Sequence, residues 1–168
     1  MNFKISIMKK TFKELPVASK VWVYQAENVL SKKTIEEILS MGTEFIHSWE
    51  SHGSEIPASI DVFYNQFVVI SADDCGDTLC GRAKDGQLKM MKEMESSLGL
   101  SLTNRMITSY KKEEKIETIS FNEFKNLAKK GEINKETIVF NNLVETKNDF
   151  LKKWETPAQN SWHNQFLN

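Results

Sequence analysis

Both cysteines of the chain lie in one polar segment, DDCGDTLCGRAKDG, at residues 73–86. The same segment contains four acidic residues, one arginine and three glycines. It follows an apolar run and precedes a helical pattern, a position where proteins often hold anions and activate thiols. Its residue types are compatible with three kinds of chemistry: metal binding, thiol redox chemistry and anion binding.

The two thiols, Cys75 and Cys80, form a single C-x₄-C pair. A structural zinc site normally needs four Cys or His ligands, so the pair is short of ligands and we predict no metal site. The spacing also differs from the C-x-x-C motif in which a helix N-terminus lowers the pKa of the first thiol. Two reduced thiols in a polar loop is the favoured interpretation, with a metal or a redox pair as alternatives.

Anion binding is the third possibility for this segment. Gly81, Arg82 and Gly86 surround the start of the predicted helix, whose free N–H groups favour phosphate or carboxylate. Asp73 and Asp74 repel an anion unless a divalent cation intervenes. A solvated connection is the favoured interpretation, because surface loops are commonly polar.

A histidine near the end of the first predicted helix provides a candidate acid or base. His52 follows Trp49 in the motif W-x-x-H-G, and a structural hydrogen bond is its favoured role. A catalytic role would require His52 to meet an acid across the sheet. The complete set of catalytic candidates is His52, Asp73, Asp74, Cys80 and Arg82.

Aromatic and amide side chains provide candidate binding residues. Trp22, Tyr24 and Phe63 share strand parity within their strands, so we expect them to line one face of the sheet, with core packing as the favoured role. Exposed aromatics on such a sheet can stack RNA bases, but the usual signature of that use is missing. The second predicted contact surface is C-terminal and comprises Asn141, Asn142, Trp162 and His163.

Composition excludes several classes of protein. The 168 residues include 22 basic and 23 acidic side chains, which argues against a dedicated nucleic-acid binder. The longest apolar runs, FVVI and TIVF, are far shorter than the roughly 20 residues of a membrane span. The N-terminus lacks the apolar stretch of a signal peptide, so we expect a cytoplasmic protein that starts at Met1 or Met8.

Hydrophobic periodicity predicts an alternation of strands and helices. The expected elements are a strand at 21–25, a helix at 33–50, strands at 60–64 and 67–72, a helix at 86–98, and strands at 105–110 and 115–119. This is the order of the split βαβ, or ferredoxin-like, layout. We therefore predict an α+β fold whose helices cover one face of an antiparallel sheet.

The predicted domain organisation has three parts. Residues 1–19 form an N-terminal extension, residues 20–119 the ferredoxin-like core, and residues 120–168 a C-terminal extension packed on the core. Ser120 and Thr146 are predicted helix N-caps in the last part. The second face of the sheet is expected to be covered by the C-terminal part, to be covered by a partner, or to remain exposed to water.

Five segments of the chain, taken together, carry a family resemblance. They are VWVYQ (21–25), W-x-x-H-G (49–53), Y-N-x-F (64–67), TIVFNNLV (137–144) and P-A-x-x-S-W-H (157–163). The set resembles a family of short uncharacterised bacterial proteins often labelled "ABC transporter ATPase", and the resemblance extends from about Leu15 onward. The usual family loop has a Ser-Gly-Cys-like segment where this chain has Cys80-Gly81-Arg82.

The ATPase label is tested against the residues it requires. An ABC ATPase needs a G-x-x-x-x-G-K-[ST] loop, and the chain contains neither this loop nor an LSGGQ-like signature. We therefore predict no ATPase activity. A second segment, SFNEFKNLAKKGEINKETIVF, is similar to part of the GYF-like peptide-binding modules, but the Gly-Tyr-Phe signature of those modules is absent.

The function predicted from these observations is binding rather than catalysis. The chain lacks a complete nucleophile, metal or phosphate motif, so we expect a non-enzymatic adaptor with a protein partner and no cofactor. The alternative is a small enzyme with a site between His52 and the 73–86 loop. An RNA- or ribosome-associated protein is the third possibility.

Overall fold

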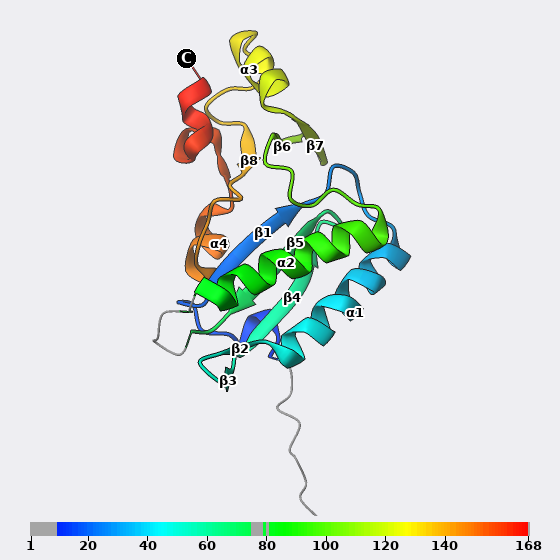
Figure 1. Ribbon diagram of the computed structural model, residues 1–168. Helices are drawn as coiled ribbons and strands as arrows, with labels where there is room; N and C mark the ends of the chain where they lie inside the picture. Colours follow the sequence, from blue (N-terminus) through cyan, green and yellow to red (C-terminus); the bar gives the residue numbers. More distant parts are fainter. Residues whose placement is uncertain (1–9, 75–78, 80, 168) are drawn as a thin grey trace, which may run out of the picture.

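The protein is a mixed α+β structure in a computed structural model that describes residues 10–74, 79 and 81–167 (Figure 1). The first half contains β1 (Lys20–Gln25), α1 (Lys32–Ser48), β2 (Glu50–Ser51), β3 (Ser54–Glu55), β4 (Ala58–Phe63), β5 (Phe67–Ala72) and α2 (Gly81–Leu98). The second half contains β6 (Ile107–Lys112), β7 (Lys115–Ser120), α3 (Phe121–Lys129), β8 (Ile138–Phe140), α4 (Lys147–Lys153) and β9 (Glu155–Pro157). Short 3₁₀ helices are η1 (Phe12–Glu14), η2 (Ala158–Asn160) and η3 (Trp162–Phe166).

The first sheet has the strand order β1-β5-β4, and both pairs are antiparallel. All six residues of the central strand β5 are buried, which explains why its sequence is apolar at consecutive positions. The β4–β5 turn carries Tyr64 and Asn65 at a φ of 52°, the left-handed geometry that a tight hairpin requires.

Helices α1 and α2 lie side by side on one face of this sheet, as the sequence predicts (Figure 1). Ser31 caps α1, because its side chain accepts a hydrogen bond from the Thr34 N–H over 3.1 Å. The core below the helices includes Ile38 and Met91, both fully buried. Burial of such apolar side chains is the main stabilising contribution to this layer.

The C-terminal part covers the opposite face of the sheet. Phe67 of β5 stacks on Phe140 at 4.7 Å between ring centroids, and Trp154 meets Phe67 edge-on at 5.1 Å. Phe63 also points to this side, whereas Trp22 and Tyr24 point toward the helices. The expectation of one shared aromatic face is therefore wrong for Phe63, because the register aligns Val62, not Phe63, with Tyr24.

The second sheet has the order β7-β6-β8-β9 and differs from the predicted layout. The split βαβ layout would place β6 beside β1 as the fourth strand of the core, with β7 in the same domain of residues 20–119. Strand β6 pairs with its sequence neighbour β7, and on its other side it pairs with β8 rather than with β1, with Tyr110 opposite Val139. The physical reason is that residues 145–147 already pair with the beginning of β1, and the loop after α2 carries the chain away from that edge.

A buried amide joins the two sheets. Gln66 Nε2 donates to the Ala26 carbonyl over 3.0 Å and to Thr118 Oγ1 over 2.6 Å. Thr118 Oγ1 in turn lies 2.7 Å from Ser109 Oγ. Because each of these groups has a partner, the second sheet is held in a defined position against the first.

Candidate functional site

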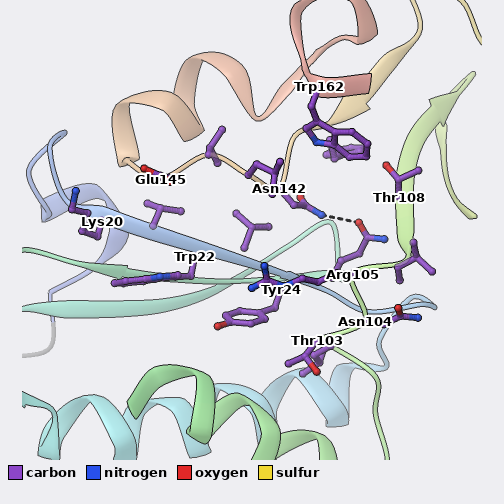
Figure 2. A pocket seen from close by; sticks show the side chains of 18 of the residues that line it. Lys20, Trp22, Tyr24, Thr103, Asn104, Arg105, Thr108, Asn142, Glu145 and Trp162 are labelled. Carbon is purple, nitrogen blue, oxygen red and sulfur yellow. Dashed lines mark hydrogen bonds between the residues drawn. The ribbon is translucent and has the colours of Figure 1, made fainter. Parts of the chain in front are cut away.

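A cleft of about 410 Å³ lies between the outer edge of β1 and the second half of the chain (Figure 2). Every residue of β1 contributes to its wall. The other walls come from residues 102–105, the beginning of β6, residues 142–145 and Trp162. Its volume falls in the range of roughly 300–1,000 Å³ typical of small-molecule sites.

The outer edge of β1 is paired only at its beginning in the part of the chain that the structure describes. The Val21 N–H donates to the Glu145 carbonyl over 3.0 Å, away from β5. The Ala26 N–H donates in the opposite direction, to the Gln66 carbonyl near β5, over 2.9 Å. Backbone groups alternate along a strand, so Val23 and Gln25 direct their N–H and C=O groups into the cleft.

Gln25 places in this wall a buried donor that has no partner among the described residues. The indole N–H of Trp154 donates to Asn142 Oδ1 over 2.9 Å, which turns Asn142 Nδ2 toward Gln25 Oε1 at 2.8 Å (the dashed line in Figure 2). An indole nitrogen can only donate, so this chain fixes the orientation of both amides. Gln25 Nε2 is left with no hydrogen-bond partner among the described residues, although Gln25 is only 4% exposed.

Trp162 provides a second buried donor. Its Nε1 atom is also without a partner in the described part of the chain, and the ring lines the cleft from the side opposite β1 (Figure 2). Buried donors without partners are costly in a folded protein, so two of them along one cleft indicate a place where acceptors are expected to bind.

A carboxylate on α2 fixes the loop that forms another wall. Glu95 Oε1 accepts the N–H groups of Leu102 and Thr103 over 2.5 and 2.6 Å, and the Thr103 hydroxyl also donates to this carboxylate. Burial raises the pKa of Glu95, but these hydrogen bonds outweigh it and the net pKa is lowered. Asn104 further anchors the loop through a 3.0 Å bond to Glu27. The wall is therefore preorganised.

The predicted aromatic residues of β1 form the wall nearest the helices. The Tyr24 hydroxyl donates to Gln87 Oε1 over 2.6 Å, and burial raises the pKa of Tyr24 above its ordinary value. Trp22 packs against Trp49 with 6.1 Å between ring centroids. Tyr24 is therefore neutral near pH 7, and both rings shape the cleft.

The rim of the cleft combines positive charge with exposed apolar side chains. Lys20, Lys84 and Arg105 line it, whereas Glu145 is its single acidic lining residue among the described positions. Leu143, which lines the cleft, is 64% exposed, and Met106, next to the lining residue Arg105, is 66% exposed. Large exposed apolar residues beside a groove are typical of interaction sites.

His163 lies behind the cleft and holds the C-terminal segment in place. Its Nε2 lies 2.7 Å from Thr108 Oγ1 and its Nδ1 lies 2.7 Å from Ser161 Oγ, with the ring fully buried. Burial lowers the pKa of His163 from 6.5 to about 4, so the imidazole is neutral near pH 7. His163, which the sequence predicts as a binding residue, does not line the cleft, whereas its neighbour Trp162 does.

The predicted catalytic residues do not contribute to the cleft. His52 is exposed in the turn between β2 and β3, with a φ of 52°. Asp73 and Asp74 follow β5, and Arg82 is exposed at the beginning of α2; none of them lines the cleft. Cys75 and Cys80 lie outside the described residues. Within the described ranges, no cluster of three or more His, Cys, Asp or Glu side chains is suited to a metal ion.

The remaining predicted binding residues are divided between the cleft and the core. Asn142 lines the cleft, whereas Asn141 supports the following turn by accepting the Leu143 N–H over 3.2 Å. Phe63 lies in the aromatic cluster below α4. Gln25 and Arg105 line the cleft but were not predicted from the sequence. Two features of the sequence could have indicated them. They are the polar Gln25 at the end of an apolar strand and the polar segment LTNR at 102–105.

Comparisons of the chain with models of protein families, with curated proteins and with solved structures found no match. The family resemblance therefore stays a prediction. Among residues 10–74, 79 and 81–167, no helix has the length and apolar character needed to cross a bilayer.

Proposed function

We propose that this protein is a non-enzymatic binding protein that holds part of a protein partner in the cleft beside β1. The observation that carries the proposal is the buried Gln25 Nε2, which has no acceptor among the described residues and lies next to a stretch of strand edge that no described segment pairs with. The lining side chains provide hydrogen-bond donors and apolar surface, which suits recognition. The proposed place of action is the cytoplasm.

The order of the first sheet supports a more specific architecture. We propose that strands β1, β5 and β4 with helices α1 and α2 are three strands and two helices of a split βαβ core, which the strand order and the shared helical face support. On this proposal, the position of the fourth strand beside β1 is occupied by residues 145–147 at one end and is left for the partner along the rest.

The experiment is site-specific photocrosslinking in the cells that make the protein. p-Benzoylphenylalanine is incorporated at Leu143 or Met106, both exposed beside the cleft, and for comparison at Leu151 and Val17. The comparison positions are matched, since their side chains are 60% exposed in each case but do not line the cleft.

The expected result is a discrete crosslinked product from Leu143 and Met106 that is absent from Leu151 and Val17. No product at any position, or equal yields at all four, would refute a partner site at the cleft.

A further inference from the structure

We infer that the cleft accepts an extended peptide segment, apolar with acidic side chains, which adds as a strand to the outer edge of β1. This inference rests on the proposed function and names the chemistry of the partner. Addition of a strand to an exposed sheet edge is an established mode of peptide recognition, because the backbone groups of the two segments pair directly.

The chain itself begins this pairing. Residues 145–147 run antiparallel to β1, with the Val21 N–H bonded to the Glu145 carbonyl and the Lys147 N–H bonded to the Ser19 carbonyl over 2.8 Å. On the N-terminal side of Glu145, residues 142–144 leave the strand edge and form the opposite wall of the cleft. The open stretch up to Gln25 spans roughly 13 Å, which is the length of about four extended residues.

The hydrogen-bonding groups along this stretch favour a peptide over a nucleic acid. Val23 and Gln25 present both N–H and C=O groups, and a peptide backbone provides complementary donors and acceptors at the same spacing. A phosphate backbone supplies acceptors only and leaves the strand carbonyls without donors. Gln25 Nε2 and Trp162 Nε1 need acceptors, which peptide carbonyls or carboxylates can provide.

Charge and apolar surface specify the side chains of the peptide. The cleft lining contains the basic residues Lys20, Lys84 and Arg105 against one acid, Glu145, so acidic side chains are complementary. The exposed Leu143 provides an apolar contact at the rim. The N-terminal sequence of this chain, MNFKISIMKK, is basic and does not match this charge.

The experiment is a selection from phage-displayed random linear dodecapeptides on the full-length protein. Selected peptides are resynthesised, and their affinities are measured for the wild type and for three variants. Val23→Pro removes an outward N–H, a change that an edge strand tolerates where the N–H is not paired. Val23→Thr keeps that N–H, and Arg105→Glu reverses a rim charge. Circular dichroism establishes that each variant is folded.

We expect acidic, β-branched peptides whose affinity falls about tenfold with Val23→Pro and stays within about twofold with Val23→Thr. Arg105→Glu is expected to weaken binding by about fivefold, with a smaller effect at high salt, since rim charges are screened. Methylation of the peptide backbone nitrogens is expected to abolish binding. This arm keeps the test decisive should Val23→Pro fail to fold.

Three outcomes overturn the inference. They are the absence of enriched peptides, affinities unaffected by backbone methylation, and a homodimer in light scattering that Arg105→Glu or Val23→Pro dissociates. The last outcome would assign the edge to a second copy of this chain. If crosslinking at Leu143 succeeds while these peptide tests fail, the proposed function stands and only the strand-addition inference is lost.

Discussion

Asn142 donates a hydrogen bond to Gln25 Oε1 over 2.8 Å, although 117 positions separate the two residues in the sequence. The bond joins the loop after β8 to the end of β1. Asn142 Oδ1 also accepts a hydrogen bond from the indole N–H of Trp154. Trp154 packs on the face of the first sheet that lies away from α1 and α2. One amide therefore links the packing of the C-terminal part to the wall of the cleft.

Replacement of this amide is expected to destabilise the protein. Asn142→Ala leaves the Trp154 indole N–H and Gln25 Oε1 without their partner, at a cost of roughly 1–3 kcal/mol in the free energy of unfolding. Chemical denaturation measures the change. Asn122→Ala, at an exposed position of α3, is the matched control and is expected to stay within about 0.5 kcal/mol. Equal effects of the two substitutions would contradict the role of Asn142.

Two helical glycines are expected to respond in opposite directions to alanine. A Cβ at Gly42 of α1 would overlap Ile60 Cδ1 and lie 3.0 Å from Ile60 Cγ2, so Gly42→Ala should lower stability by roughly 1–3 kcal/mol. A Cβ at Gly86 of α2 would meet Phe45 Cζ and Trp49 Nε1 at 3.8 Å, which is ordinary contact.

Gly86→Ala is therefore expected to stabilise by about 0.5–1 kcal/mol through helix propensity. Thermal unfolding of both variants checks the pair. A neutral Gly42→Ala would mean that α1 does not pack on β4 as closely as the structure has it.

Acid is expected to destabilise the fold through His163. Its pKa in the fold is about 4, below the ordinary value of 6.5, so the unfolded state binds the proton first as the pH falls. The contribution of the neutral His163 to the free energy of unfolding is complete above pH 6.5 and decreases below it. At pH 5 the loss is about 2 kcal/mol. Denaturation at a series of pH values measures this slope.

His163→Gln should flatten the slope between pH 6.5 and 5, because glutamine does not titrate in this range. A wild-type free energy of unfolding that stays constant between pH 6.5 and 5 would refute the conclusion that the His163 imidazole is buried and neutral.

The loop wall is expected to depend on Glu95. Glu95→Ala removes the acceptor of the Leu102 and Thr103 N–H groups, so these amides should exchange with solvent about fivefold faster or more, a change of roughly 1 kcal/mol. The lowered pKa of Glu95 means that this contribution is present above pH 4.5 and is lost as the pH falls below it.

Glu93→Ala is the control for this exchange experiment, because Glu93 lies on the surface of the same helix, where its carboxylate is 3.9 Å from Lys89 Nζ. Unchanged exchange at Leu102 and Thr103 in Glu95→Ala would show that other contacts hold the loop.

Local patterns in the sequence predicted the elements more reliably than their pairing. The periodicity of apolar residues located α1, and the predicted caps Ser120 and Thr146 are both confirmed. The place of β6 was not predictable in this way, since its pairing with β8 depends on contacts between distant segments such as Tyr110 and Val139.

The candidate site was predictable only in part for the same reason. Asn142 and Trp162 stood out as polar and aromatic residues in a distinctive C-terminal segment, and both line the cleft. Gln25 acquires its significance from the stretch of the β1 edge that no described segment pairs with, a property of the topology rather than of any motif. His52 and the 73–86 segment attracted attention through residue type, yet the described candidates among them lie outside the cleft.

The most direct test of a binding edge at β1 is amide hydrogen exchange at single residues, measured by NMR with and without a selected peptide. The Tyr24 N–H faces β5 and should exchange slowly in both states, whereas the Val23 N–H should exchange rapidly in the free protein and slowly in the complex. A Val23 amide that is already protected without peptide, or that stays unprotected at saturation, would contradict the account.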